Sequence, residues 1–176
     1  MASTTEPLGT NLDHVRAAPR DEGLLELIAC RPAVGEREVL EEAELDLEQG
    51  LVGDSWSLRG KHPDRGTQVT LMNARAAALV AGDRERWALA GDQLYVDLDL
   101  SPANLPPGTR LAIGSALLEV TEIPHLGCGK FTERFGTKAR ALVNSPEGVA
   151  LNLRGINTRV VEGGTVRRGD TVRKLA

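Results

Sequence analysis

The sequence is poor in cysteine and in aromatic residues. Its two cysteines, Cys30 and Cys128, are too few for a disulfide scaffold, and their spacing does not match a zinc site. Aromatic side chains make up only 3% of the 176 residues, so the hydrophobic core must be built from Leu, Val, Ile and Ala. With 41% apolar and 26% charged residues, the composition is that of an ordinary globular chain.

The signatures of several protein classes are also missing. The chain has no G-x-G-x-x-G, Walker, C-x-x-C or H-E-x-x-H motif, which argues against the commonest nucleotide and zinc sites. No apolar run approaches about 18 residues, and the first residues lack the apolar core of a secretory signal, so we expect a cytoplasmic protein with no membrane partner. A net charge of −4 argues against a nucleic-acid partner but leaves room for a local basic pocket.

The remaining pattern predicts short β-strands joined by glycine turns. Residues 1–22 are polar and are predicted to form an arm, in which 11–17 can make a helical turn, and 23–176 form one domain. We expect strands at 24–30, 39–47, 68–72, 93–100, 110–113, 116–123, 157–162, 165–168 and 171–175, helices at 74–81, 84–89 and 137–144, and a loop at 50–66. The predicted fold is mainly β, a closed or nearly closed barrel with a few short peripheral helices.

The segment around Cys128 is the most chemically suggestive part of the chain. Two glycines flank this residue, and because neither carries a Cβ, a ligand can approach the backbone closely. Lys130 and Arg134 follow and favour the thiolate, which is the form of cysteine that attacks electrophiles and binds metals. A helix that begins just after Gly129 would add partial positive charge beside the sulfur. The alternative is a small buried core residue, which is the role we expect for Cys30.

Other polar residues are candidates for the same site. His125 precedes Cys128 by three residues and could orient or deprotonate the thiol, or it could be a surface turn residue. With Asp54 the two could form a Cys-His-Asp set, although the sequence does not show whether they lie close together. Further candidates for binding a ligand are Lys130, Arg134, Arg154, Asn157, Arg159, Gly53, Asp54, Lys61 and His62. For each arginine the alternative is an ordinary solvated surface charge.

The order of these elements resembles the MOSC domain, a module shared by the C-terminal part of molybdenum cofactor sulfurases and by stand-alone bacterial proteins. The likeness covers about residues 23–175, and the cysteine segment is most similar to the stand-alone bacterial branch. The matching segments are Arg31-Pro32, 50–54, 68–73, 105–114, 116–121, Cys128-Gly129-Lys130 with Arg134-Phe135-Gly136, and 166–170. The chain departs from the family pattern at Ser55-Trp56, where many relatives have a histidine, and at Gly91-Asp92-Gln93, where many have Gly-Glu-Asn.

The resemblance implies a β-barrel that binds the molybdenum cofactor, a pterin with a dithiolene and a phosphate. It implies that Cys128 reaches molybdenum or carries sulfur, and a soft thiolate suits a sulfur-rich metal centre. Some relatives reduce N-hydroxylated compounds, so a small oxidoreductase acting on a small-molecule substrate is the first hypothesis. Because the chain has no flavin or iron–sulfur signature, its electrons would come from a separate donor protein.

Two other functions remain open at this point. The first is a sulfur carrier that holds a persulfide on Cys128 for the biosynthesis of a metal-sulfur cluster or cofactor. The second is a non-catalytic module that binds an anionic small molecule or a protein partner.

Overall fold

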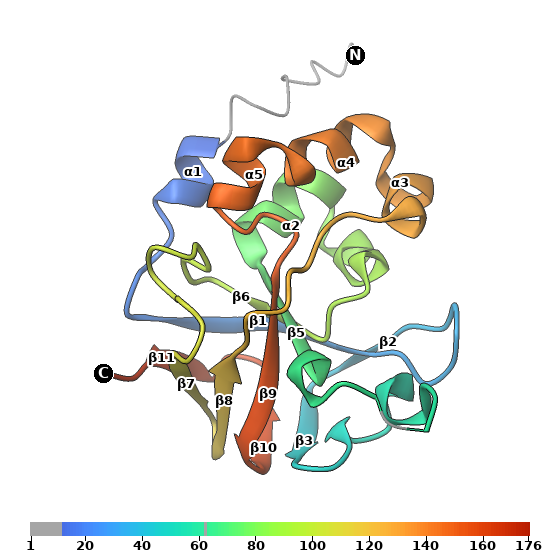
Figure 1. Cartoon of the computed structure of the whole chain (residues 1–176), viewed down its shortest axis with the longest axis vertical. Coiled ribbons are helices and arrows are strands. Elements are labelled where there is room, and N and C mark those ends of the chain that lie inside the picture. The colour runs from blue at the N-terminus through green and yellow to red at the C-terminus, as the bar shows by residue number, and fades with distance from the viewer. Residues whose placement is uncertain (1–11, 62) are drawn as a thin grey trace.

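A computed structural model of the chain describes residues 12–61 and 63–176, and its centre is a β-barrel (Figure 1). Its elements are α1 (Leu12–Arg16), β1 (Glu22–Cys30), β2 (Glu38–Leu40), β3 (Glu42–Asp46), β4 (Gly50–Leu51), η2 (Ser55–Leu58), η3 (Arg65–Thr67), β5 (Val69–Asn73), α2 (Ala74–Ala81), η4 (Arg84–Ala90), β6 (Leu94–Val96), β7 (Arg110–Ile113), β8 (Ala116–Val120), α3 (Gly129–Phe135), α4 (Thr137–Asn144), α5 (Pro146–Ala150), β9 (Ile156–Glu162), β10 (Gly164–Arg167) and β11 (Thr171–Lys174). Among these, no helix is long and apolar enough to cross a bilayer.

The barrel is a closed sheet of seven strands. The strands follow the order β11-β7-β8-β9-β5-β6-β1, and antiparallel pairing between β1 and β11 closes the circle. The β5–β6 pair is parallel, because α2 and η4 carry the chain back to the start of β6. The strand β2 pairs with the last residues of β1, on the edge opposite β6. The strands β10, β3 and β4 form a second sheet. The mainly β barrel predicted from the sequence is confirmed.

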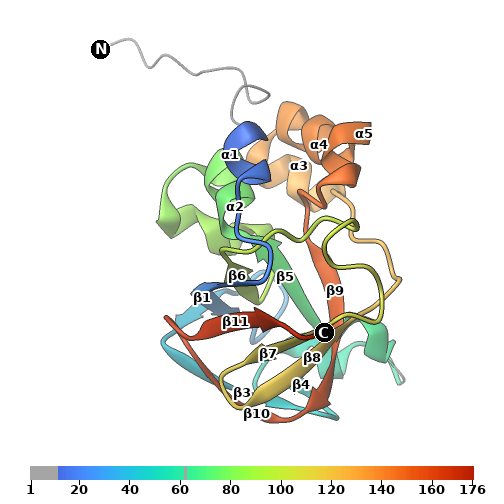
Figure 2. The ribbon, with the colours of Figure 1, turned by 90° about the vertical axis from the view of Figure 1, so that its left-hand side faces the viewer.

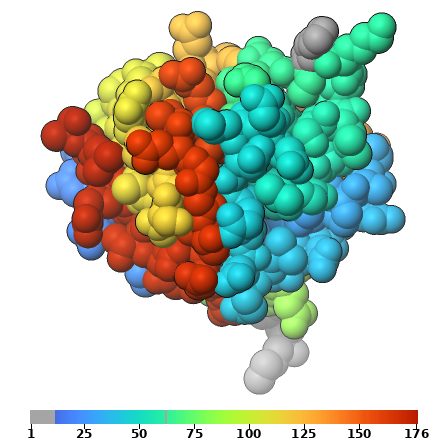
Figure 3. All heavy atoms as spheres, turned by 90° about the horizontal axis from the view of Figure 1, so that it is seen from below, coloured from blue at the N-terminus to red at the C-terminus, as the bar shows by residue number. Residues whose placement is uncertain are grey.

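The helices gather at one end of the barrel (Figure 2). One hydrophobic cluster fills the barrel, and a second lies between the barrel and the helices. Leu12 and Val15 of α1 belong to the second cluster, so this part of the predicted arm packs against the domain. Seen from the opposite end, residues of β3 and β4 (cyan) lie against those of β9 and β10 (red) (Figure 3), as the pairing of β3 with β10 requires.

Three predicted strands are shorter or divided in the structure. The strand expected at 116–123 ends at Val120, as β8. The strand expected at 93–100 ends at Val96, because its partner β5 stops at Asn73, opposite Val96, where α2 begins. Beyond Val96, the amides of Asp97 and Asp99 donate to the carbonyls of Leu24 and Pro19. The strand expected at 39–47 divides into β2, which pairs with β1, and β3, which pairs with β10 and β4. The alternating pattern runs through both pieces and does not show that the chain changes sheets between them.

The predicted helices at 74–81 and 137–144 are confirmed with those bounds as α2 and α4. The Asn73 side chain accepts a hydrogen bond from the Arg75 amide at 2.8 Å and so caps α2. The helix expected at 84–89 is the 3₁₀ helix η4, and Asp83 does not cap it through its side chain. The short helix α5 was not predicted, and α3 begins at Gly129, one residue after Cys128.

Candidate functional site

A cavity of about 300 Å³ contains Cys128. The cavity is lined by the loop between β1 and β2, η2 and the residue after it, the end of η4, and the segment that runs from His125 into α3. These segments meet on the side of the molecule where β2 and α3 are labelled in Figure 1. The volume is at the lower end of the range of roughly 300–1,000 Å³ that is usual for small-molecule sites.

Cys128 is the N-cap residue of α3, and its side chain is exposed in the cavity. Hydrogen bonding from the Phe131 backbone amide lowers the pKa of the Cys128 thiol; burial opposes this effect, and the Lys130 amide and the charge of Arg154 reinforce it. Cys30 is the opposite case, because it is buried in the barrel core, and this burial raises the pKa of its thiol. The two thiols therefore differ both in access to solvent and in the ease of ionisation.

We expect iodoacetamide at neutral pH to alkylate Cys128 and to spare Cys30 in the folded protein. The thiolate is the reactive form, so alkylation of Cys128 should also persist at lower pH than that of a thiol with an ordinary pKa. Mass spectrometry of the digested protein measures both sites, and unfolding in guanidinium provides the control because it should expose both thiols. Preferential labelling of Cys30 in the folded protein would contradict this assignment.

Three arginines from three segments converge on the C-terminal end of η4. Arg37 Nε, Arg134 Nη1 and Arg154 Nη2 donate to the consecutive carbonyls of residues 88–90, at 3.2, 2.9 and 2.8 Å. Positive charge is favourable there because the last carbonyls of a helix lack partners within the helix. Gly91 follows with a φ of 89°, and a Cβ at this position would lie 3.3 Å from Arg37 Nη2 and 3.6 Å from Arg134 Nη1. The absence of a side chain at Gly91 therefore lets the two guanidinium groups crowd together.

The cavity wall carries positive charge that nearby carboxylates do not neutralise. Among the residues that the structure describes, no aspartate or glutamate lines the cavity, although Asp54 and Asp92 pair with Arg31 and Arg154 from behind the wall. Within residues 12–61 and 63–176, four lining cations form no ion pair: Arg37, Arg59, Lys130 and Arg134. Burial lowers the pKa of Arg37, and the neighbouring charge of Arg134 lowers it further. Such a concentration of donors and like charge suits an anionic ligand.

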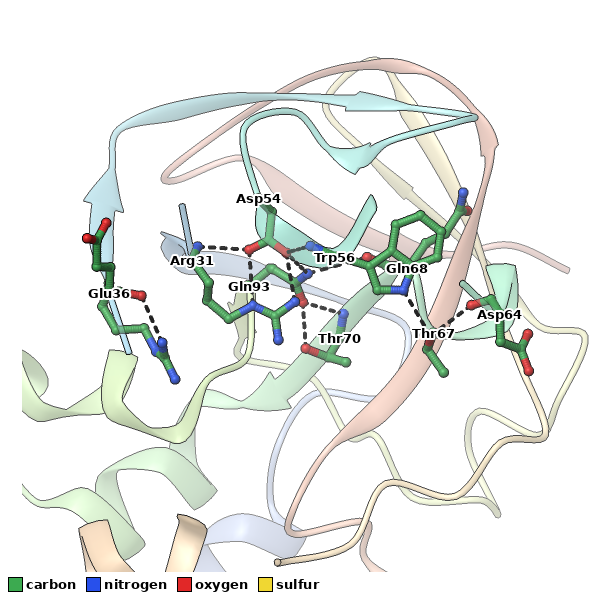
Figure 4. A network of polar contacts seen from close by, with 10 residues as sticks. Arg31, Glu36, Asp54, Trp56, Asp64, Thr67, Gln68, Thr70 and Gln93 are labelled. Atoms are coloured by element: carbon green, nitrogen blue, oxygen red, sulfur yellow. Dashed lines mark hydrogen bonds and ion pairs between the residues drawn. The ribbon is translucent and has the colours of Figure 1, made fainter. Parts of the chain in front are cut away.

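Asp54 fixes Arg31 in the cavity wall (Figure 4). Asp54 Oδ1 accepts from the Arg31 amide at 2.8 Å and from its Nε at 3.0 Å, while Oδ2 accepts from Arg31 Nη2 at 2.8 Å and from the Trp56 amide at 3.0 Å. Burial opposes ionisation, but the hydrogen bonds and charge of Arg31 hold the pKa of Asp54 below its usual value. Gln93 donates to Asp54 Oδ2 at 3.4 Å and accepts from the Thr70 amide at 2.8 Å, so this network ties the wall to β5.

A second buried cluster joins Asp92, His125 and Arg154. Asp92 is fully buried; its Oδ2 accepts from Arg154 Nη1, and its Oδ1 lies 3.5 Å from His125 Nδ1. Burial lowers the pKa of His125 to about 4 despite the attraction of Asp92, so the imidazole is neutral at neutral pH. Asp92 Oδ1, His125 Nδ1 and Arg154 Nε lack hydrogen-bond partners in the described part of the chain. Asp92 therefore takes the place beside His125 that the sequence suggested for Asp54.

Five of the residues predicted from the sequence line the cavity together: His125, Cys128, Lys130, Arg134 and Arg154. Asp54 acts from behind the wall through Arg31, and Gly53 precedes it with a φ of 92°. The structure thus brings the cysteine segment and one distant arginine, Arg154, together in one site. The Gly53–Asp54 pair lies behind the cavity wall, where Asp54 holds the lining residue Arg31.

The other predicted residues lie elsewhere. Asn157 Nδ2 donates to the carbonyls of residues 123 and 124, at 3.0 and 3.4 Å, and so supports the segment that leads to His125. Arg159 pairs with Glu119 at 2.8 Å and does not line the cavity. Lys61 is exposed and is also absent from the lining, and His62 lies outside the described residues.

Four residues of the site were not among the candidates from the sequence: Arg31, Arg37, Arg59 and Asp92. Arg31 and Asp92 did lie in segments that the resemblance to the MOSC domain singled out, Arg31-Pro32 and Gly91-Asp92-Gln93. Arg37 and Arg59 have no such signal, because the fold of two surface segments alone brings them to the cavity.

Comparisons with known proteins agree with this fold. The model of the MOSC domain family matches residues 54–173. The crystal structure of YuaD from Bacillus subtilis is 17% identical with a TM-score of 0.60, over 86% of this chain and 94% of that one. YiiM from Escherichia coli is 20% identical with a TM-score of 0.58, over 87% and 70% of the two chains, and YiiM from Geobacillus stearothermophilus is 11% identical with a TM-score of 0.52, over 90% and 75%. At these identities the likeness shows the fold alone. No curated protein matches the sequence.

Proposed function

Since the chain belongs to the MOSC domain family, we propose that its cavity binds the molybdenum cofactor and that the protein is a small oxidoreductase that reduces N-hydroxylated compounds. The observation that carries this proposal is the presence, in one cavity, of a thiol with a lowered pKa and four cations without carboxylate partners. A thiolate is a ligand for a soft metal centre, and the cations suit the phosphate of the cofactor.

The residues of the cavity fit this cofactor in their chemistry. Among the described residues, no group of three or more His, Cys, Asp or Glu side chains could hold a metal ion. A metal at Cys128 would therefore have to bring most of its ligands with it, as the dithiolene of the cofactor does. Arg154 lines the same cavity, where Asp92 and the carbonyl of residue 90 hold its guanidinium group in place.

The bound cofactor would supply the two-electron chemistry, and the chain would hold it and shape its surroundings. Cys128 would be the ligand of the metal, and Arg37 and Arg134 would bind the anionic part of the cofactor. His125 lines the cavity in its neutral form, so its imidazole can donate a hydrogen bond to the substrate, or accept one from it, without adding a positive charge to the cavity. In the overall reaction, two electrons and two protons convert N–OH to N–H and water. The electrons would come from a separate donor protein, because the sequence has no flavin or iron–sulfur signature.

We expect the protein to carry molybdenum and pterin when it is made in a host that synthesises the cofactor, and to lack both when made in a host that cannot. Elemental analysis and fluorescence of the released, oxidised pterin measure the two components per chain. The preparation from the deficient host is the control for adventitious metal. Protein from the competent host that contains neither component would count against the proposal.

A second candidate function is sulfur transfer, and the exposure of Cys128 is the observation that favours it. A solvent-accessible thiol with a lowered pKa can hold a persulfide and release it to an acceptor. Intact-mass spectrometry separates the two candidates. An additional sulfur atom on Cys128 that a reductant removes, in protein without molybdenum, would favour the carrier over the oxidoreductase.

A further inference from the structure

Three segments that border the cavity each carry a large exposed apolar side chain. Val34 lines the cavity and is 85% exposed, Leu58 precedes the lining residue Arg59 and is 79% exposed, and Leu126 lies between His125 and Cys128 and is 53% exposed. Single exposed apolar residues are normal, but apolar residues that gather beside a functional cavity mark an interaction site. These three belong to separate segments of the chain, each of which contributes residues to the lining of the same cavity.

The same opening is basic. Arg59 and Lys130 line the cavity, are exposed, and pair with no carboxylate in the described part of the chain. Elsewhere on the surface, many exposed arginines are neutralised by a glutamate: Arg65 by Glu48, Arg110 by Glu119, Arg167 by Glu42, Arg168 by Glu41 and Arg173 by Glu22. The chain as a whole carries a net charge of −4, so an acidic protein would be attracted to this opening although the net charge of the molecule repels it.

We propose that the electron-donor protein docks on the mouth surface, formed by Val34, Leu58, Arg59, Leu126 and Lys130, and that it does so with an acidic face. This inference rests on the proposed oxidoreductase function. Each turnover takes two electrons, from one two-electron donor or from two molecules of a one-electron donor such as ferredoxin, which is oxidised. Together with two protons, these electrons convert N–OH of the substrate to N–H and water. Electron transfer weakens steeply with distance, and Cys128 is exposed within this opening, so a donor seated here brings its redox centre as near to the reacting centre as the surface allows.

The test uses opposite charges at one position of the mouth surface. Leu58 does not line the cavity, so Leu58→Glu and Leu58→Lys leave its wall intact. Val149→Glu on α5, where the native side chain is 45% exposed and away from the cavity, is the matched control. Each cofactor-loaded variant reduces an N-hydroxylated amidine with electrons from dithionite, or from reduced plant-type ferredoxin as the probe for a small acidic donor.

At low ionic strength we expect Leu58→Glu to raise the KM for ferredoxin by about 10-fold relative to the wild type, because charge at a docking surface governs the rate of encounter. Leu58→Lys should not raise it, Val149→Glu should match the wild type, and salt should reduce the difference. The dithionite-driven rate should be the same in all four proteins.

Three results would overturn the docking proposal. They are equal KM values for the wild type and Leu58→Glu, equal effects of the Glu and Lys variants, or no turnover with ferredoxin in protein that dithionite drives. If molybdenum-containing wild type reduces no N-hydroxylated compound even with dithionite, the proposed function itself fails, and the docking proposal fails with it.

Discussion

Replacing Asp54 with Ala is expected to lower the free energy of unfolding by about 3–5 kcal/mol, the cost of breaking a buried ion pair by removing one partner. The Asp54 side chain is fully buried and that of Arg31 is only 11% exposed. Without the carboxylate, the Arg31 guanidinium would remain buried and unpaired, and the Trp56 amide would lose its acceptor. Equilibrium unfolding in urea, followed by circular dichroism, measures the change.

The control for Asp54→Ala is Glu48→Ala, which breaks an ion pair of the same 2.8 Å length between exposed side chains. This variant should lose less than about 1 kcal/mol, because solvent screens an exposed pair. The pH dependence provides a second check. Since the pKa of Asp54 is lowered by folding, its contribution is complete above its unfolded pKa of about 3.9 and is lost as the pH falls through the folded value. An Asp54→Ala protein as stable as Glu48→Ala would contradict this account of the network.

Replacing Cys128 with Ser is expected to reduce the rate of N-hydroxylated amidine reduction by about 100-fold or more, since even changes outside the direct ligands of a metal cost about 10–100-fold. The fold should be unaffected, because the Cys128 side chain is exposed and serine is favoured at an N-cap. Dithionite-driven turnover and urea unfolding of the same preparation separate the two effects.

Cys30→Ser is the matched control for the Cys128 variant. It places a hydroxyl in the barrel core and should cost about 1–3 kcal/mol of stability, while the cavity keeps its thiol and its activity. If Cys128→Ser keeps full activity, or loses activity only because it unfolds, the thiol has no direct part in the reaction.

The fold could be predicted from the sequence where local pattern and local partners agree. Asn73 and Gly82 mark the ends of α2, and the strands predicted at 110–113 and 116–123 correspond to the antiparallel pair β7 and β8, although β8 ends at Val120. The hydrophobic pattern does not predict where a strand ends when the end depends on a neighbouring strand from another part of the sequence. The strand β6 ends early because its neighbour β5 stops at Asn73, where α2 begins, and the local pattern of residues 93–100 contains no sign of this.

The candidate site likewise has a part that the local sequence indicates and a part that only the fold brings together. Cys128 stood out because its glycines, its cations and the start of α3 all lie within a few residues of it. The charges that complete the site come from far away along the chain, since Arg154 pairs with Asp92 across 62 residues and Arg37 binds the carbonyl of Ala88 across 51. Only the closed barrel brings these segments together, so the basic character of the cavity is a property of the fold.

The most direct measurement is the molybdenum content of the wild type and of Cys128→Ser, made side by side in a host that synthesises the cofactor. If the cavity holds the metal through its thiolate, we expect close to one molybdenum per wild-type chain and much less in the variant, while the two proteins have the same free energy of unfolding. A metal-free wild type, or equal molybdenum in both proteins, would contradict it.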